Sequence, residues 1–277
     1  MTLPATDQAE SLRRMLAPRV TRRIAVVSAE RGAGGSTVAL GLAHALARQG
    51  ERVLLVEEDG QGRAAALSGA QSGAQSGAQP RATLADVLAG RVSLDAALGE
   101  RPADAAAVLP AGRIDADAAR RADALADLRT VLVDTRPEAD GALSPFAQTA
   151  HNLLVVMRAE RLSLPATYAS IKRLHHLYAC RRFQLLVNLA ATEAEVGTLA
   201  RNLSQTCSAY LGVQLNLAGY LPADPLVARS ARLGRGVVDA FPAAPATAAL
   251  RRTAAAIGTW PLPAPVPHAS PVAEAGA

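Results

Sequence analysis

The chain has 277 residues, of which half are hydrophobic and only 3% aromatic, and it carries a formal net charge of +5. This length is enough for one α/β domain with a full hydrophobic core. We find no apolar signal segment and no apolar run of membrane-spanning length, so we expect a cytoplasmic protein.

The positive charge comes almost entirely from arginine. Lys172 is the only lysine, and the arginines are scattered as pairs rather than as a basic run interleaved with aromatic residues. This pattern does not favour specific nucleic-acid binding. Cys180 and Cys207 have no disulfide or metal-ligand spacing and are expected to be reduced thiols.

Residues 1–20 form an N-terminal segment that predicts a short amphipathic helix. Asp7 is a candidate N-cap, and apolar side chains recur at helical spacing before Pro18 ends the pattern, namely Ala9, Leu12, Met15 and Leu16. A helix of about ten residues is marginal alone in water, so we expect it to form on a partner.

Residues 21–258 predict the main domain, in which apolar strands alternate with alanine-rich helices. The expected strands are Ile24–Ser28, Val53–Val56, Ala106–Leu109, Val131–Asp134, Leu153–Met157, Phe183–Asn188 and Leu217–Tyr220. The helical patterns between them include Thr37–Gln49, Thr83–Ala89, Leu164–Leu177 and Glu193–Leu211. This alternation indicates a doubly wound α/β fold, with a mostly parallel sheet covered on both faces.

Two segments fall outside this order. Residues 68–79 repeat Ser-Gly-Ala-Gln three times and predict a low-complexity loop within the domain. Residues 259–277 are rich in proline and alanine and are expected to form a disordered tail.

A glycine-rich turn follows the first strand and opens the first helix of the domain. Gly32, Gly34 and Gly35 allow close backbone approach, so N–H groups at the helix start can face a phosphate. Ser36, followed by Thr37, stands where a hydroxyl ligates Mg²⁺ in phosphate-binding loops. The position before Ser36, which carries the phosphate-gripping lysine in such loops, is Gly35.

Two acidic residues follow later strands. Asp59 lies just after the second strand, where it can position an attacking water, and Asp134 ends a strand, where it can steady the metal. Together with the glycine turn, these residues predict binding of ATP or ADP with Mg²⁺. The alternative interpretation is an ordinary strand-to-helix turn with Asp134 as a cap.

The segment from Arg23 to Asp59 resembles the MinD/ParA class of P-loop ATPases. Their loop reads Lys-Gly-Gly-x-Gly-Lys-Ser/Thr and their second strand ends in Val-Asp-x-Asp. Four positions match, which are Gly32, Gly34, Ser36 and Asp59. Four positions depart, because lysines are replaced by Glu30 and Gly35, a glycine by Arg31 and an aspartate by Glu57.

Later motifs extend the resemblance over residues 22–258. Leu186-Val187-Asn188 resembles the Val-Asn strand end of the family, which implies that Asn188 lies near the adenine. The segment from Gly219 to Asp224 resembles the late Gly-x-x-Pro-x-Asp turn of the same proteins.

The N-terminal segment narrows the resemblance. Asp7-Gln8-Ala9-Glu10-Ser11-Leu12-Arg13 is similar to the Asp-Gln-Ala-x-x-Leu-Arg pattern of the FlhG (FleN) family, MinD-like regulators of flagellar number and placement. There the helix engages FlhF, a signal-recognition-particle-type GTPase. The resemblance implies that Gln8 orients the attacking water in that GTPase. It also implies contacts with flagellar switch (C-ring) proteins and a partner-activating role for Asp7, Gln8, Ala9, Leu12 and Arg13.

The loss of two lysines opposes tight ATP binding. A lysine beside a phosphate charge contributes on the order of 4 kcal/mol at an effective dielectric near 20. The resemblance implies that the lysine replaced by Glu30 crosses a dimer interface, so a carboxylate there disfavours an ATP-sandwich homodimer. We expect weak nucleotide binding without efficient hydrolysis. Arg31 and Arg136 are candidates for restoring part of the phosphate-binding charge.

The resemblance therefore implies a regulator of flagellar number, placement and assembly that acts through protein contacts. Three alternatives remain: an active, unconventional ATPase of the same family that cycles between monomer and dimer, a MinD-like accessory factor of cellulose synthesis, and a ParA-like non-specific DNA binder. The helical pattern Thr247–Ile257 has too little apolar bulk for more than weak membrane contact, and its other interpretation is domain packing.

Overall fold

The structure is a computed structural model that describes residues 20–58, 82–99, 102, 104–138 and 140–262. The predicted N-terminal helix, Asp59 and the Ser-Gly-Ala-Gln repeat lie outside the described residues. So does most of the proline-rich tail. The first residues predicted as tail pack against the domain, because the Trp260 side chain is buried and its carbonyl oxygen accepts a hydrogen bond from the Arg22 guanidinium.

Seven strands form one sheet in the order β3-β2-β4-β1-β5-β6-β7, and all the strand pairs are parallel. They are β1 (Arg22–Ser28), β2 (Val53–Glu57), β3 (Ala107–Pro110), β4 (Thr130–Thr135), β5 (Asn152–Arg158), β6 (Arg182–Ala190) and β7 (Gln214–Pro222). The predicted α/β fold with its parallel sheet is confirmed. The observed strands mostly extend beyond the predicted ranges because polar residues such as Arg22 and Gln214 continue the backbone pairing.

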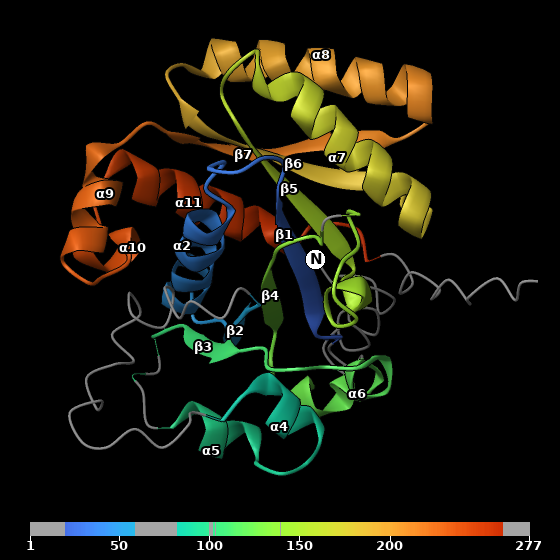
Figure 1. Cartoon of the computed structure of the whole chain (residues 1–277). Helices are drawn as coiled ribbons and strands as arrows, with labels where there is room; N and C mark the ends of the chain where they lie inside the picture. Colours follow the sequence, from blue (N-terminus) through green and yellow to red (C-terminus); the bar gives the residue numbers. More distant parts are fainter. Residues whose placement is uncertain (1–19, 59–81, 100–101, 103, 139, 263–277) are drawn as a thin grey trace, which may run out of the picture.

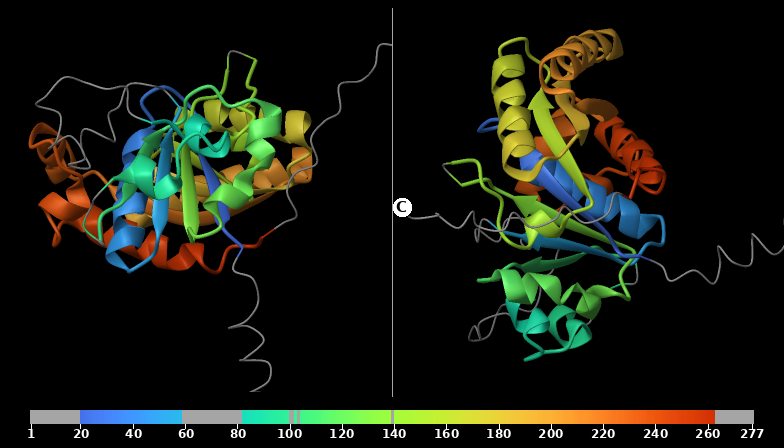
Figure 2. Two further views of the ribbon diagram at one scale, coloured as in Figure 1. Left: turned by 90° about the horizontal axis from the view of Figure 1, so that it is seen from below. Right: turned by 90° about the vertical axis from the view of Figure 1, so that its right-hand side faces the viewer.

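Helices cover both faces of the sheet (Figure 1). They are α2 (Gly35–Arg48), α4 (Leu84–Leu88), α5 (Leu94–Leu98), α6 (Ala116–Arg120), α7 (Ser163–Tyr178), α8 (Glu193–Leu211), α9 (Pro225–Arg232), α10 (Val237–Ala240) and α11 (Pro245–Ile257), with short 3-10 turns at Ala122–Leu125 and Ala147–Thr149. Figure 2 shows α7 and α8 on one side of the sheet and α2 with α11 on the other.

The central strand β1 shows why the strands read as continuous apolar runs. Ala25 and Val27 belong to the core under α7 and α8, whereas Ile24 and Val26 belong to the core under α2 and α11. Successive side chains of a strand point to opposite faces, and both faces are covered here. All four side chains are therefore fully buried.

The apolar stripe of α11 is used in domain packing. Leu250, Ala254 and Ile257 are each 1% exposed, and α11 packs on α2 and β7. The approach to α2 is close because Gly41 has no side chain, and a Cβ atom there would lie 2.6 Å from a methyl carbon of Leu250. Within the described residues, no helix is both long enough and apolar enough to cross a membrane.

Replacing Leu250 with alanine tests this packing. We expect Leu250→Ala to lower the free energy of unfolding by about 2–5 kcal/mol, the usual cost of a cavity left by a buried leucine. Arg252→Ala, on the exposed side of the same helix, should change it by less than about 0.5 kcal/mol. Urea unfolding of both variants gives the measurement, and equal losses would contradict the packing of α11.

Candidate functional site

The glycine loop lies at the carboxyl end of β1, between that central strand and α2. Strand β1 is flanked by β4 and β5, so the ends of three neighbouring strands meet around the loop. Ligands of open α/β sheets bind outside the carboxyl ends of the strands. The loop is anchored to the sheet where the Ala29 N–H donates to the Val156 carbonyl oxygen at 2.9 Å.

The loop begins with a tight turn from Glu30 to Ala33. The Ala33 N–H donates to the Glu30 carbonyl oxygen at 3.2 Å, and Gly32, the third residue of the turn, has a φ of +83°. A positive φ at this position favours glycine. Gly34 also has a positive φ, +88°, and forms the N-cap of α2. The sequence therefore places glycine where the backbone conformation needs it.

Ser28 occupies the space beside Gly35. The Gly35 N–H donates to Ser28 Oγ at 3.2 Å, and a Cβ atom on residue 35 would overlap that oxygen. A lysine at this position would therefore require the Ser28 hydroxyl to turn away. Glycine at position 35, in place of the lysine, leaves the space in which Ser28 Oγ accepts the Gly35 N–H.

Ser36 and Thr37 supply the donors that remain at the start of α2. The first N–H groups of a helix have no partner within the helix. In the described part of the chain, the N–H groups of Ser36 and Thr37 donate to no other residue, and both residues are exposed. Together with the positive end of the helix dipole, they can bind a phosphate oxygen, and the Ser36 hydroxyl can face a metal ion.

Asn188, near the end of β6, braces the loop from the other side. Its Nδ2 donates to the Ala33 carbonyl oxygen at 2.8 Å, and its Oδ1 accepts the Leu189 N–H at 2.9 Å. The amide is buried against Gly34, where a Cβ atom would overlap Nδ2. The sequence analysis predicted Asn188 near the nucleotide, but it did not predict the hydrogen bond from Asn188 to the loop backbone at Ala33.

Glu30, which replaces the first lysine of the loop, is tied to α7. The hydroxyl of Ser163, the first residue of that helix, donates a hydrogen bond to the Glu30 carboxylate. Ser163 is itself buried, and its carbonyl oxygen accepts from the Thr167 hydroxyl at 2.7 Å. The carboxylate is therefore held by a residue of its own chain.

Carboxylates gather at the neighbouring ends of β2 and β4. Glu57 and Asp134 pair in register and are 2% and 7% exposed. Glu58 follows, its N–H donating to the Asp134 carbonyl oxygen at 3.2 Å. Burial raises the pKa of Glu58, while a hydrogen bond from the Ser144 hydroxyl opposes the rise. In the described residues, no three side chains of the metal-binding kinds form a group.

The structure thus brings most of the predicted site residues to one edge of the sheet. Those at the loop are Gly32, Gly34, Gly35, Ser36, Thr37 and Asn188, while Asp134 lies on the next strand in register with Val26. Arg31 and Arg136 are exposed. Asp59 and the partner-activating residues Asp7, Gln8, Ala9, Leu12 and Arg13 lie outside the described residues. Sequence reasoning did not single out Ser28 or Glu58 at this site, although each directly adjoins a predicted motif.

A parallel sheet with a glycine loop between its central strand and the next helix defines a P-loop nucleotide-binding domain. Residues 24–237 match the family described as the CobQ/CobB/MinD/ParA nucleotide binding domain. The fold is similar to that of the MinD cell division protein of Aquifex aeolicus, with a TM-score of 0.66 and 20% identity over 88% of this chain and 99% of MinD. It is also similar to MinD complexed with Mg-ADP from Pyrococcus horikoshii, with a TM-score of 0.60 and 19% identity over 86% and 96% of the two chains.

Closer sequence relatives define the family more narrowly. Antiactivator FleN of Pseudomonas aeruginosa is 31% identical over 256 residues, which are 87% of this chain and 88% of FleN. The chain therefore belongs to the FlhG (FleN) family of MinD/ParA-like proteins. An uncharacterized ATP-binding protein of Methanocaldococcus jannaschii is 28% identical over 243 residues, covering 84% of this chain and 86% of that protein.

Two glycine substitutions separate backbone strain from the Asn188 contact. Gly32→Ala should cost about 1–2 kcal/mol of unfolding free energy, since alanine disfavours a positive φ but meets no atom within 4 Å. Gly34→Ala should cost about 1 kcal/mol more, because the Asn188 amide must also move and lose its hydrogen bond. Urea unfolding measures both, and the difference should disappear in an Asn188→Ala background. Equal costs in the parent chain would contradict the bracing role of Asn188.

Proposed function

We propose that this protein is a cytoplasmic flagellar regulator of the FlhG (FleN) type. It acts by contact with other proteins, and its own ATP hydrolysis is weak or absent. The observation that carries the proposal is a glycine loop with positive φ values at Gly32 and Gly34, in which Glu30 and Gly35 stand where the family's loop has its two lysines. The name of the related FleN, an antiactivator, describes a protein that acts against another protein, which supports an output through contact.

The loop would bind ATP or ADP with Mg²⁺ weakly. The N–H groups of Ser36 and Thr37 would hold phosphate oxygens, and Ser36 with Asp134 would hold the metal. Phosphate and water oxygens would complete the magnesium coordination, as Mg²⁺ commonly requires. Asn188 would adjoin the adenine and Asp59 would position the water. The Mg-ADP named in the P. horikoshii MinD complex supports this choice of ligand.

Charge makes the binding weak. Gly35 supplies no cation to the phosphates, which removes on the order of 4 kcal/mol per charge pair at an effective dielectric near 20. Glu30 adds a negative charge, and its hydrogen bond to Ser163 keeps it within its own protomer. An ATP-sandwich homodimer is therefore disfavoured. Arg31, exposed on the turn, and Arg136, exposed after β4, are the cations that would partly compensate.

The regulatory activity would reside in the partner-activating segment, residues 7–13. The pattern from Asp7 to Arg13 is the part of this chain that is similar to the FlhF-binding helix of the family. Gln8 would enter the active site of an FlhF-type GTPase and orient the attacking water. The domain would then position this segment and contact flagellar switch proteins. None of these steps requires the domain to hydrolyse ATP.

GTP turnover tests this proposal directly. Adding a peptide of residues 7–16 to an FlhF-type GTPase should raise its turnover, because Gln8 completes the active site. A Gln8→Ala peptide should lose at least about tenfold of the stimulation, or 1.4 kcal/mol of transition-state stabilisation. A Ser11→Ala peptide, changed at a variable position of the motif, is the matched control and should stimulate normally. Absence of stimulation by the unchanged peptide would contradict the proposed mechanism.

A further inference from the structure

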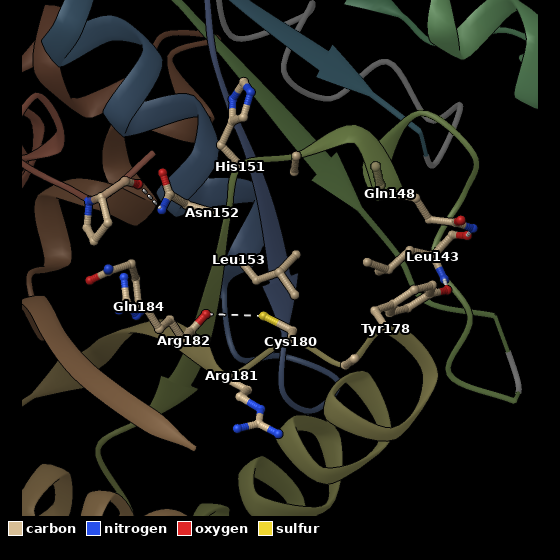
Figure 3. Close-up of a pocket in the computed structure, with 14 residues that line it drawn as sticks. Leu143, Gln148, His151, Asn152, Leu153, Tyr178, Cys180, Arg181, Arg182 and Gln184 are labelled. Carbon is tan, nitrogen blue, oxygen red and sulfur yellow. Dashed lines mark hydrogen bonds between the residues drawn. The ribbon is translucent and has the colours of Figure 1, made fainter. Parts of the chain in front are cut away.

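A pocket opens at the edge of the sheet opposite the glycine loop, at the amino ends of β5 and β6 (Figure 3). Its volume is about 320 Å³, and its lining is mostly apolar. Leu153 lies in the middle, with Leu143 and the Tyr178 ring on one side and Asn152 on the other. Small-molecule sites have volumes of about 300–1,000 Å³, so this pocket has the size for one small organic ligand.

Hydrogen bonds within the domain hold the polar groups of the pocket wall in place. The Tyr178 hydroxyl accepts the Leu143 N–H at 2.7 Å, and Gln148 Nε2 donates to the Leu143 carbonyl oxygen at 2.8 Å. On the other side, Asn152 Nδ2 donates to the Pro261 carbonyl oxygen at 2.9 Å. None of these bonds requires a ligand. The pocket is therefore preformed, which lowers the entropic cost of binding.

The rim of the pocket is positively charged. Arg181 and Arg182 line it and are both exposed. Of the described residues that line the pocket, none is an Asp or a Glu. Within the described part of the chain, neither guanidinium forms an ion pair. Guanidinium groups bind carboxylates through charge-assisted hydrogen bonds, so this rim favours an anionic group on the ligand.

His151 shows that the inner wall of the pocket also disfavours a cation. Its Nδ1 accepts the Arg23 N–H at 3.0 Å. Burial, together with the charges of Arg23 and Arg22, lowers the pKa of His151 to about 4. The imidazole is therefore neutral at physiological pH and adds no charge to the wall. The arginines that oppose a positive charge here attract a negative one, in agreement with the charge of the rim.

We propose that this pocket binds a small apolar monocarboxylate. Its hydrocarbon body contacts Leu143, Leu153 and the Tyr178 ring, and its carboxylate lies at the rim beside Arg181 and Arg182. A second charged or strongly polar group would enter the apolar interior without a partner, which is unfavourable. The glycine loop lies at the opposite end of the strands, so this binding goes beyond the proposed function and requires neither a nucleotide nor the GTPase.

Octanoate is the probe that tests this proposal. Calorimetric titration of the full chain should give a Kd of about 1 mM or tighter, an affinity within reach of a ligand of this size. The uncharged 1-octanol has the same hydrocarbon chain and should bind at least about tenfold more weakly, because it cannot form charge-assisted hydrogen bonds with the rim. Acetate, which has the charge without the chain, should also bind at least about tenfold more weakly.

Two double variants separate the rim from the overall charge of the protein. Arg181→Gln combined with Arg182→Gln should weaken octanoate binding by at least about tenfold and leave 1-octanol binding unchanged. Arg201→Gln combined with Arg252→Gln removes the same charge at exposed positions of α8 and α11 and should bind octanoate like the parent chain. Thermal unfolding midpoints equal to that of the parent chain establish that both variants are folded.

The thiol of Cys180 locates the bound probe. Cys180 lines the pocket, and its Sγ donates to the Arg182 carbonyl oxygen at 3.2 Å, whereas Cys207 is fully buried in the core. Octanoate at about ten times its Kd should slow the reaction of Cys180 with maleimide by about tenfold, because only the unoccupied pockets leave the thiol accessible.

Four results would overturn the proposal: no binding of octanoate at about 10 mM, equal affinities for octanoate and 1-octanol, an equal loss of binding in the two double variants, or an unchanged rate at Cys180 when octanoate is bound. The assays contain no nucleotide and no GTPase. Ligand binding can therefore fail while the peptide still stimulates the GTPase, and stimulation can fail while ligand binding stands.

Discussion

The close contact between Asn188 and the glycine loop is the interaction on which the site depends. The amide binds the Ala33 carbonyl oxygen and leaves room for only a hydrogen atom on Gly34. It ties the end of β6 to a loop that starts from β1, with β5 between them. Because the loop is fixed by a side chain of the domain, its shape does not require a bound phosphate or a lysine.

Two serines add contacts at the positions where the family's lysines are replaced. Ser28 accepts the Gly35 N–H, and Ser163 donates to Glu30. Both contacts lie within the domain, and neither requires a bound nucleotide. A loop built this way can preserve the fold and the surfaces of a MinD-like protein while contributing little charge to ATP. This separation of loop shape from phosphate-binding charge is the physical basis of the regulation through protein contacts that we propose.

Much of the fold was predictable because its signals are local. Continuous apolar runs such as Val53–Val56, bounded by turns, marked most of the strands, and the parallel sheet followed from the helices between them. The strand ends were less predictable, since Arg22 and Gln214 pair through their backbones regardless of polarity. The glycine turn could also be predicted, because the motif has glycine at residues 32 and 34, the positions where φ is positive.

Contacts between distant residues were not predictable from the sequence alone. Asn188 and Ala33 lie 155 residues apart, and Glu30 and Ser163 lie 133 apart, so only the folded sheet shows that they meet. Pro261 likewise returns to the start of β1, where its carbonyl oxygen accepts a hydrogen bond from Arg22, and no local pattern indicates this contact. The half-buried Glu58 likewise accepts a hydrogen bond from Ser144, which lies 86 residues further along the chain.

The central claim is that the loop keeps its shape while it lacks a cation for the phosphates of ATP. Calorimetric titration with ATP and Mg²⁺ tests this claim most directly. The parent chain and Ser28→Ala should bind only at millimolar nucleotide or more weakly. Ser28→Ala combined with Gly35→Lys, which makes room for a cation, should bind up to about a thousandfold more tightly, the factor that corresponds to ~4 kcal/mol. Micromolar binding by the parent chain that is lost in Arg31→Ala would contradict the account, because an arginine would then supply the charge that the lysines lack.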